Sequence, residues 1–590
     1  MAQHTKFVLV TGGVASGVGK GSVTSALGVV LRSHGVRVTA VKVDPHLNVD
    51  SGQASAFEPG EVYVLDDGGQ VDMDLGEYER NLDLRLTAGH WVTSGKIFEQ
   101  VITREKSGHY LGESVRMVPH ATDAVQDWIA DVAGRPVDRS GLPPEVCFIE
   151  LGGTAGDFEL SLYLEALQQL AFKVGTDNFC VVHVTLLFNH SREGDQKTKP
   201  TQHSVRMLRE AGLKPDFLIC RADGPLEDAT RRKLSQCCQV PFDCVLALYA
   251  MSNIDRAPLL LAEQDVGVSL CARLCLRNDD VVTPVLPLPD AAVGDACEAR
   301  LGDWRMLADR KDLCTEEVLI AIVGKHGGSH DAYMSVWKAL RHAGVEAHLH
   351  LEVLAVESAD LEANVQFADA RRFDTAWQRL RSASAVVLPG GFRDRSVEGR
   401  LRALHYCRTS HTPVLCIAAG FQLAVVEFAR AELCLESAHS TEFDEATPHP
   451  VVVFMPEASA AVMGGTMRLG ARTTHLLDEE SLAFRLYGGR KAVQERHRHR
   501  HEVSAQFVPS LEGRGFVFSG RDDRGQRMSI GELRGHPFFI GAQFHPEFAS
   551  RPASPAPLIL GLVLAAARRL DRRLKEDGGL LRPGAGFERH

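Results

Sequence analysis

The sequence predicts an α/β protein with two domains, each built on a parallel sheet that helices cover on both faces. Near-continuous apolar strands such as "RVTAVKVDP", "FCVVHVTLL" and "PDFLICRAD" alternate with helical stretches in the first half, as is typical of buried parallel strands. The second half repeats the scheme with "SAVVLPGGF" and "TPVLCIAAG". Both halves also begin alike, because "FVLVTGGVASGVGKGS" and "VLIAIVGKHGG" are each an apolar strand running into glycines.

A stretch without periodicity separates the two halves. The chain has 590 residues, enough for more than one hydrophobic core. The segment "DDVVTPVLPLPDAAVGDACEARLGDW" is rich in Pro and Asp and indicates a linker. We place the first domain at 1–278, the linker at 279–315 and the second domain at 316–574. The last residues, 575–590, are rich in glycine and charge, and we expect a disordered tail.

Composition is typical of a cytoplasmic globular enzyme. The chain is 44% hydrophobic and 24% charged, and its net charge of −11 argues against a general nucleic-acid-binding role. The first strand begins almost at once, so we expect no secretory signal. No apolar run reaches the about 18 residues that a membrane helix needs. The thirteen cysteines form no C-x-x-C pair, which argues against a zinc site or a disulfide framework.

A glycine-rich turn near the amino terminus indicates a phosphate site. The segment "GGVASGVGKGS", from Gly12 to Ser22, follows a strand and precedes an apolar helix. Backbone N–H groups in such a turn can surround phosphate oxygens, and Lys20 supplies a cation for the outer phosphates. In the standard P-loop a Ser or Thr follows the lysine directly, whereas Gly21 intervenes here. The glycine spacing is also one residue longer than standard, so a simple tight turn is the alternative.

Two carboxylate segments favour a magnesium-dependent nucleotide site. Asp72 and Asp74 lie in "GGQVDMDLGEYER", and Glu150 ends a predicted strand in "FIELGG". Mg²⁺ takes one or two protein carboxylates beside phosphates and waters, and ligands bind at the carboxyl edge of a parallel sheet. Each carboxylate alone could lie in a solvated loop. Together with the glycine turn, they indicate a metal site.

A second basic segment, "DQKTKPTQ" (195–202), places Lys197 and Lys199 on either side of a threonine. Two lysines in one loop can bind a second polyphosphate. Taken in isolation, the pattern is also that of a solvated turn.

The motifs together resemble the CTP synthase family. The blocks that carry the resemblance occur in the family's order and cover nearly all of 7–570: "TGGVASGVGKGS", "DDGGQVDMDLGEYER", "VCFIELGGTAGD", "QKTKPTQ", "PGGF", "STEFD", "MGGTMRLG", "ERHRHRHEV" and "QFHPEF". Two inserts, "GRPVDRSGLPPEVC" and "PLLLAEQ", resemble the eukaryotic branch. The resemblance implies a P-loop-type amidoligase domain followed by a class I glutamine amidotransferase domain with a flavodoxin-like α/β fold.

The resemblance also implies a reaction and its partners. ATP would phosphorylate the 4-oxygen of UTP with the help of Mg²⁺. Ammonia, released from glutamine in the second domain, would then displace the phosphate to give CTP. CTP would act as an inhibitor and GTP as a possible effector. A homotetramer is implied as well, with filaments or mixed assemblies with a homologue as further forms.

Site residues are carried over by motif. ATP would be bound by Gly17, Val18, Gly19, Lys20, Gly21, Ser22 and Asp74. Lys20 and Lys42 would stabilise charge during phosphoryl transfer, while Asp74 and Glu150 would hold Mg²⁺. UTP or CTP would be bound by Ser16, Asp157, Phe158, Glu159, Lys197, Thr198, Lys199, Pro200, Thr201, Gln202 and Lys233.

The second domain lacks the family's nucleophile. The family pattern G-[IV]-C-L-G-M-Q reads "CIAAGFQ" here (416–422), and Ala418 stands at the position of the cysteine. A strand followed by a sharp turn and a helix normally presents that nucleophile. Without a thiolate, glutamine cannot form a thioester. Cys416 lies two residues earlier on the strand, where the turn does not force its side chain outward, so we do not expect it to substitute.

The other glutaminase positions are present. His545 and Glu547 in "QFHPEF" match the base and its orienting carboxylate. Glutamine would be bound by Gly390, Gly391, Gln422, Glu442 and Arg500. For Arg500 an exposed basic strand is the alternative. The alternation "RHRHRH" can also be read as metal-binding, although no cysteine or carboxylate cluster accompanies it.

The first domain departs from the family too. The chain has "DPH" (44–46), "GQASA" (52–56) and "PGE" (59–61) where the family reads D-P-Y, G-T-M-S-P and H-G-E. At 249–251 "YAM" replaces Lys/His-Asp-Val on the adenine side. Two hypotheses follow: an enzyme that aminates UTP with free ammonia, or a non-catalytic nucleotide-binding paralogue that assembles with an active homologue and regulates it. An engineered Ala418 is a less favoured third.

Overall fold

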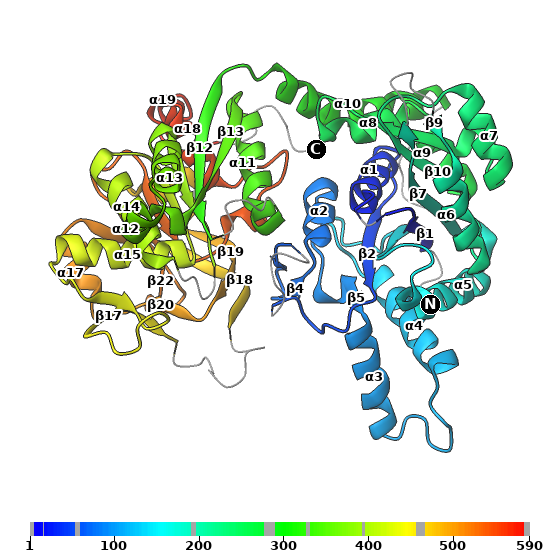
Figure 1. Ribbon diagram of the computed structural model, residues 1–590, viewed down its shortest axis with the longest axis horizontal. Coiled ribbons are helices and arrows are strands. Elements are labelled where there is room, and N and C mark those ends of the chain that lie inside the picture. The colour runs from blue at the N-terminus through cyan, green and yellow to red at the C-terminus, as the bar shows by residue number, and fades with distance from the viewer. Residues whose placement is uncertain are drawn as a thin grey trace. The chain divides into compact units, whose positions relative to one another are not determined.

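The computed structural model describes residues 5–15, 17–52, 60–189, 196–276, 290–325, 331–391, 396–455 and 467–582, with the backbone alone at 290–300. The chain divides into two compact units. The amino-terminal unit comprises Met1–Ser51 and Asp74–Asp312, and the carboxy-terminal unit comprises Gly52–Met73 and Leu313–His590 (Figure 1). Each unit is described by itself.

The amino-terminal unit is built on a seven-stranded sheet in the order β11-β10-β7-β1-β6-β2-β5. Every neighbouring pair is parallel, and β1, β2 and β6 are buried along nearly their whole length. The parallel sheet predicted from the apolar strands is thus confirmed. Its strands are β1 (Lys6–Gly12), β2 (Val38–Asp44), β5 (Trp91–Thr93), β6 (Val146–Leu151), β7 (Phe179–Leu186), β10 (Phe217–Ala222) and β11 (Val245–Tyr249).

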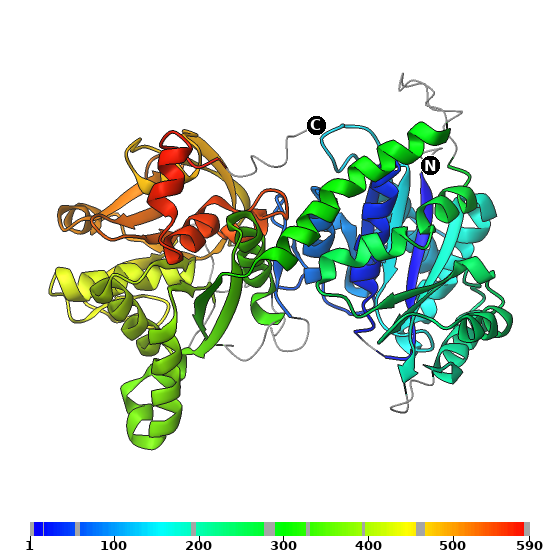
Figure 2. The same cartoon turned by 90° about the horizontal axis from the view of Figure 1, so that it is seen from above.

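Helices cover both faces of this sheet (Figure 2). On one face α1 (Lys20–Ser33) packs against α8 (Ala257–Ala262) and α9 (Val266–Arg273). On the other, α4 (Thr122–Ala133) and α5 (Ser161–Val174) share one apolar cluster with alternate residues of the strands. The remaining helices are α2 (Met73–Leu82), α3 (Ser94–Lys106), α6 (Lys199–Glu210) and α7 (Asp228–Cys238), and a short pair, β8 (Phe188–Asn189) and β9 (Gln196–Lys197), precedes α6.

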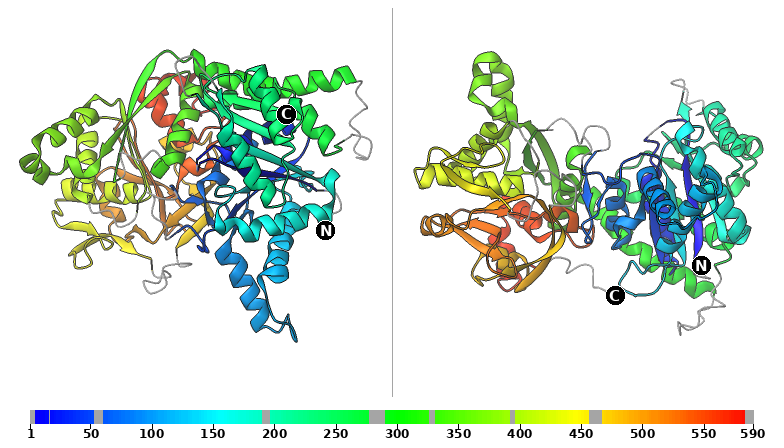
Figure 3. Two further views of the ribbon diagram at one scale, coloured as in Figure 1. Left: turned by 45° about the vertical axis from the view of Figure 1, so that its right-hand side comes forward. Right: turned by 90° about the horizontal axis from the view of Figure 1, so that it is seen from below.

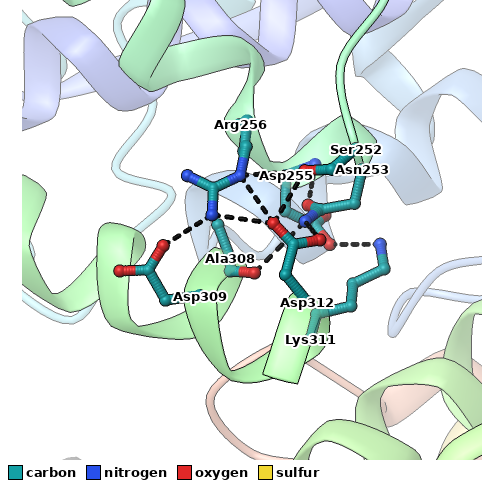
Figure 4. A network of polar contacts seen from close by, with 8 residues as sticks. All are labelled: Ser252, Asn253, Asp255, Arg256, Ala308, Asp309, Lys311 and Asp312. Atoms are coloured by element: carbon teal, nitrogen blue, oxygen red, sulfur yellow. Dashed lines mark hydrogen bonds and ion pairs between the residues drawn. The ribbon is translucent and has the colours of Figure 1, made fainter. Parts of the chain in front are cut away.

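A long helix, α10 (Asp290–Leu313), occupies most of the predicted linker. Figure 4 shows the charged side chains that anchor its last turns to the loop before α8. The ion pairs join Arg256 to Asp309 and Asp312, at 2.6 and 2.7 Å, and Lys311 to Asp255, at 2.7 Å. Contacts with another part of the unit, which composition does not reveal, therefore order this stretch. Residues 277–289 lie outside the described residues.

The carboxy-terminal unit has a nine-stranded sheet in the order β13-β12-β14-β15-β23-β22-β21-β18-β19. The strands from β13 to β23 are parallel, as predicted for this half, and the pairs from β23 to β19 are antiparallel. The strands are β12 (Glu317–Gly324), β13 (His350–Glu357), β14 (Ala385–Leu388), β15 (Val414–Ile417), β18 (Arg468–Leu476), β19 (Ala492–His499), β21 (Phe516–Arg521), β22 (Met528–Leu533) and β23 (Phe539–Ala542).

Two apolar clusters fill the two faces of this sheet, and Figure 3 shows the helices that cover it. One holds α11 (Met334–Ala347) and α18 (Pro557–Ala566), and the other holds α13 (Ala370–Ser382), α14 (Val397–Ser410) and α15 (Ala419–Glu432). A small sheet joins β16 (Ala438–Ser440), β17 (His449–Phe454) and β20 (His501–Val503), and the shorter helices are α12 (Ala363–Ala368), α16 (Leu482–Leu486), α17 (Val508–Gly513) and α19 (Leu570–Glu576). No helix in the described ranges is long and apolar enough to cross a bilayer.

A segment of the first domain as we predicted it belongs to the carboxy-terminal unit. Residues 60–73 carry the hairpin of β3 (Tyr63–Val64) and β4 (Gln70–Val71). Arg496 of β19 forms an ion pair with Asp66 at 2.6 Å and donates to the Tyr63 hydroxyl at 3.0 Å. A Cβ on Gly470 would lie 2.6 Å from the carbonyl oxygen of Asp66, so only glycine permits this close approach.

Part of the tail that we expected to be disordered is ordered. Helix α19 reaches Glu576, and Arg573 pairs with Asp577 at 3.0 Å. Leu581 is only 2% exposed and belongs to the apolar cluster of α11 and α18. A pair of leucines among glycines and charges is too weak a pattern to predict this burial. Residues 583–590 lie outside the described residues.

Candidate active sites

The glycine turn between β1 and α1 places Lys20 at the start of the helix. Gly17 and Gly19 have φ angles of 71° and 92°, in the left-handed region that favours glycine. Lys20 donates from Nζ to the carbonyl oxygen of Gly153 at 2.5 Å. Burial and the neighbouring Lys42 ammonium lower the pKa of Lys20. Ser16, a predicted nucleotide contact, lies outside the described residues.

Three charged side chains meet beside this turn. Lys42 lies near the end of β2, Asp74 lies in the first turn of α2, and Glu150 lies near the end of β6. The Lys42 ammonium contacts the Asp74 carboxylate and lies 2.6 Å from Glu150 Oε1. Glu150 is 1% exposed, and the Tyr78 hydroxyl donates to its Oε2. Positions about a hundred residues apart in the sequence therefore converge, as the carboxyl edge of a parallel sheet requires.

The position of Gly21 explains the departure from the standard P-loop pattern. A Cβ on Gly21 would lie 2.8 Å from Asp74 Oδ1 and 3.6 Å from Glu150 Oε2. Real Cβ atoms essentially never come as close as the first distance. Glycine after the lysine therefore lets the start of α1 approach the two carboxylates.

Replacement of Gly21 by alanine is expected to lower the rate of the reaction that the resemblance implies about 100-fold, because the added methyl group would displace Asp74 from the phosphate turn by a fraction of an ångström or more. Initial rates with UTP, ATP and ammonium measure the effect. Gly302→Ala is the matched control, since a Cβ there meets nothing within 4 Å. Equal rates for the two variants would show that the close approach of Gly21 has no catalytic role.

The donor set at this cluster fits Mg²⁺. Asp74 and Glu150 offer carboxylate oxygens, the hard ligands that this cation prefers. Within the described ranges no group of three or more His, Cys, Asp or Glu side chains could hold a metal by itself. Lys42 occupies the space between the two carboxylates and balances their charge.

The predicted pyrimidine-nucleotide residues fall on two neighbouring segments and one separate helix. Asp157 lies close enough to Lys20 to raise its pKa, partly offsetting the effect of burial. A Cβ on Gly156 would lie 2.8 Å from Met207 of α6, so the loop at 153–159 packs against that helix. Lys197 and Lys199 are exposed at the start of α6, Phe158 and Glu159 are exposed on the loop, and Lys233 is exposed on α7.

Two of these predicted contacts face the interior. Thr201 is buried and accepts a hydrogen bond from the Thr185 hydroxyl at 3.3 Å. Thr198 is buried as well, and its hydroxyl accepts from Gln202 Nε2 at 3.0 Å. These hydroxyls order the start of α6. Pro200, at the first turn, begins the helix without needing a backbone donor.

The sequence reasoning missed a buried histidine under the glycine turn. His183 of β7 has Nδ1 2.8 Å from the Thr11 hydroxyl and Nε2 2.5 Å from the Ser204 hydroxyl. Burial, with a smaller effect of Lys20, lowers the pKa of His183 to about 3, so the imidazole is neutral. A Cβ on Gly13 would lie 1.5 Å from Ser204 Oγ, which places this network against the turn. In the sequence, the one indication of this network is a histidine within the apolar stretch "FCVVHVTLL".

In the carboxy-terminal unit, the turn between β15 and α15 has the geometry of a nucleophile elbow. Ala418 has φ 48° and ψ −107°, a conformation that costs an alanine about 1–3 kcal/mol. Its N–H donates to the carbonyl oxygen of Ala542 at 2.7 Å. A Cβ on Gly420 would lie 2.3 Å from the carbonyl oxygen of Leu388, so α15 packs directly on β14. The surrounding backbone holds the strained turn although no nucleophile occupies it.

The predicted base and its carboxylate lie beside Ala418. His545 Nδ1 is 2.8 Å from Glu547 Oε1, and both side chains are buried. The imidazole stacks on Phe548 at 5.1 Å. A Cβ on Gly390 would lie 2.8 Å from His545 Cε1 and 3.4 Å from the Ala418 methyl group. The structure therefore brings together predicted positions of a glutaminase site around the methyl group of Ala418.

The thiol of Cys416 does not lie at the elbow. Its side chain is fully buried in the apolar cluster of α13, α14 and α15, whereas Ala418 belongs to the cluster on the opposite face of the sheet. Burial raises the pKa of the Cys416 thiol well above its ordinary value, which disfavours the nucleophilic thiolate. The expectation that Cys416 does not substitute for the nucleophile agrees with this geometry.

The predicted glutamine-binding residues line the same part of the unit. Gln422 donates to the carbonyl oxygen of His501 at 2.9 Å, and His501 Nδ1 lies 3.4 Å from Glu442. Arg500 joins β19 to β20 and is half-buried, so it does not lie on an exposed basic strand. Gly390 and Gly391 follow Pro389, whose carbonyl oxygen accepts from the buried guanidinium of Arg400, a contact that the sequence did not predict.

The alternation "RHRHRH" has a structural explanation. Its first two arginines hold the segment 60–73, because Arg496 pairs with Asp66 and Arg498 donates to Gln70 Oε1 at 3.0 Å. His497 and His499 are buried, with 3.0 Å between Nδ1 of the first and Nε2 of the second. Among the described residues no metal-binding group includes them.

Comparison with known proteins agrees with this division into two units. A family model described as "CTP synthase N-terminus" matches residues 6–276, and one described as "Glutamine amidotransferase class-I" matches residues 329–565. CTP synthase 1-A of Xenopus laevis is 46% identical over 578 residues, covering 98% of this chain and 95% of its own length. CTP synthase 1 of Homo sapiens is 47% identical over 571 residues, covering 97% and 94%.

A solved structure is similar to part of this chain. It is the glutaminase domain of Trypanosoma brucei CTPS with bound acivicin, which is 32% identical and is covered over 94% of its length by 43% of this chain, with a TM-score of 0.40.

Proposed function

Since the chain belongs to the CTP synthase family, whose two domains it carries over nearly its full length, we propose that it converts UTP to CTP with ATP and free ammonia. The observation that carries the second half of this proposal is Ala418, which stands at a strained elbow beside a complete His545–Glu547 pair. A methyl group cannot attack the amide of glutamine. Nitrogen must therefore reach the first domain from solution.

The amino-terminal unit supplies the phosphoryl-transfer chemistry in this proposal. The turn at 17–22 would bind the ATP phosphates through backbone N–H groups and the helix dipole. Asp74 and Glu150 would hold Mg²⁺, which when bound neutralises charge on the phosphates. Lys20 and Lys42 would stabilise the negative charge that develops as the γ-phosphoryl group passes to the 4-oxygen of UTP. Their ammonium groups lie beside the turn, Lys42 next to the carboxylates.

The second step needs only ammonia. Its lone pair would attack C4 of the phosphorylated pyrimidine, and the C–O bond would break to release phosphate and leave the 4-amino group of CTP. The lysine-bearing segment at 197–199, with Asp157 and Lys233, would bind UTP or the inhibitor CTP. We extend to this chain the family's cytoplasmic homotetramer and a possible GTP effector as parts of the same proposal.

The test is CTP formation from UTP, ATP and Mg²⁺ with ammonium or glutamine as the nitrogen source. We expect CTP with ammonium and none with glutamine, because a thiolate is needed only in the second case. The absorbance change of the pyrimidine ring follows the reaction, and chromatography identifies CTP. CTP from glutamine without contaminating ammonia would contradict the proposal.

A non-catalytic role is the second candidate. It is favoured by the substitutions in both predicted active sites, namely Ala418 and the segment "YAM" at 249–251, which begins at the last residue of β11. Such a paralogue would bind nucleotides and join tetramers or filaments of an active homologue. Absence of CTP with either nitrogen source, together with co-purification of mixed assemblies, would favour this role over catalysis.

A further inference from the structure

Behind the His545–Glu547 pair lies a buried carboxyl group that the proposed reaction does not use. Glu495 of β19 is 4% exposed, and its Oε1 accepts a hydrogen bond from the Tyr487 hydroxyl at 2.7 Å. Its other oxygen, Oε2, is enclosed without a hydrogen-bond partner in the described part of the chain. The same is true of Oε2 of Glu547. Two enclosed carboxylate oxygens without donors are costly unless a proton lies between them.

The backbone places the two carboxyl groups next to each other. The turn η9 (Pro546–Ala549) packs against β19. The N–H of His545 donates to the carbonyl oxygen of Arg496 at 2.8 Å. This bond joins the residue after Glu495 to the residue two before Glu547, so the segments that carry the two carboxyl groups lie side by side. Glu547 is accordingly one of the charges that raise the pKa of Glu495.

The surroundings favour a protonated Glu495 at neutral pH. Burial raises the pKa of Glu495 to about 8. The Tyr487 hydroxyl and the Arg496 guanidinium lower it, whereas the carboxylates of Glu547 and Asp66 raise it further. The carboxyl group can then accept from Tyr487 at Oε1 and donate from Oε2.

The next side chains of β19 on this face are neutral as well. Burial, with the neighbouring His499, lowers the pKa of His497, and burial with Arg468 lowers that of His499 to about 3. The layer behind the His545–Glu547 pair therefore carries no charge of its own at neutral pH.

We propose that Glu495, in its protonated form, donates a hydrogen bond from Oε2 to Oε2 of Glu547 and so extends the pair to a chain of four: Tyr487, Glu495, Glu547 and His545. Glu495 is then a positioning residue. It holds the Glu547 carboxylate in the orientation that accepts from His545 Nδ1, which leaves His545 Nε2 as the acceptor facing the nucleophile position. This inference concerns the amidotransferase site alone and does not depend on whether the chain makes CTP.

The first test uses the pH dependence of unfolding in the full chain. An unfolded glutamate has a pKa of about 4.3, so the folded state binds the proton of Glu495 more tightly. That contribution is fully present below about pH 4.3 and is lost as the pH rises toward 8. Glu495→Gln keeps the shape and the donor but does not titrate. We expect the melting temperature of the wild type to fall relative to this variant by several degrees between pH 5 and pH 8, on the order expected for one titrating group.

The second test measures which ring nitrogen of His545 carries the proton. In the ¹⁵N-histidine spectrum of the full chain, assigned with a His545→Gln variant, we expect the Nδ1–H tautomer in the wild type and in Glu495→Gln. Glu495→Ala removes the donor and should shift the populations of the two tautomers. Glu532→Gln is the control, because Glu532 is a buried carboxyl group of the same unit that bonds to Ser519 and to backbone N–H groups.

If the melting temperatures of the wild type and of Glu495→Gln change equally with pH, Glu495 is not protonated in the folded state and the proposal is wrong. An unchanged His545 signal in Glu495→Ala, or the same shift in the Glu532→Gln control, would overturn the positioning role. Neither outcome bears on the ammonium-dependent synthesis of CTP, so the role of Glu495 and the proposed function are tested independently.

Discussion

Ala418→Cys is expected to give the chain glutamine hydrolysis, with an increase in glutamate release on the order of 10³-fold or more over the wild type. The elbow already has the backbone conformation that projects the side chain at 418, and His545 lies within contact of the same space. The new thiol would meet a base whose other nitrogen is already held by Glu547 at 2.8 Å. Glutamate release and the mass of a covalent adduct with an electrophilic glutamine analogue measure the gain.

Ala419→Cys is the matched control for this substitution. It introduces the same thiol one residue later, at the first position of α15, where the elbow does not direct it toward His545. Only the thiol at 418 should form the adduct. If Ala418→Cys neither reacts with the analogue nor releases glutamate, the defect of the glutaminase site extends beyond the missing sulfur. CTP formation from ammonium is measured separately, because it does not require the glutaminase site.

The elbow was predictable from sequence because every feature that defines it is local. An apolar strand, a small residue, a glycine and an apolar helix follow one another without interruption in "PVLCIAAGFQLAVVEF". The same reasoning correctly predicted β2 and β7 from continuous apolar runs, since a parallel strand buried on both faces needs apolar residues at nearly every position. The position of Glu150 near a strand end followed from the same pattern.

Features that depend on distant contacts were not predictable. The hairpin at 60–73 has no pattern that assigns it to one core rather than another, and only its contacts with Arg496 and Gly470 show where it belongs. Helix α10 is anchored by Arg256, which precedes it by more than thirty residues. The burial of Glu495 could not be read from an alternating polar strand, because a charged residue on such a strand is normally the solvent-facing one.

Lys42→Met is expected to lower ammonium-dependent CTP formation about 10²–10³-fold, the usual cost of removing one preorganised charge at a developing anion. The substitution keeps the length of the side chain and removes the ammonium. Asp74 and Glu150 would then repel each other beside the phosphate turn, and Glu150 is buried, so its charge would be uncompensated. Initial rates at saturating UTP, ATP and ammonium measure the loss.

Lys96→Met separates this effect from the general cost of losing a partly buried lysine. Lys96 belongs to the same unit, and its ammonium is held by the carbonyl oxygens of Ala88 and Trp91 at 3.0 and 2.8 Å, with no carboxylate among these partners. Both substitutions remove an ammonium group that has polar partners, but of the two lysines Lys42 is the one that lies between the carboxylates that would bind the metal. If the two substitutions reduce the rate equally, Lys42 contributes to folding alone. A large loss confined to Lys42→Met places the charge of its ammonium in the phosphoryl-transfer step, because Lys42 is the one of the two that contacts Asp74 and Glu150.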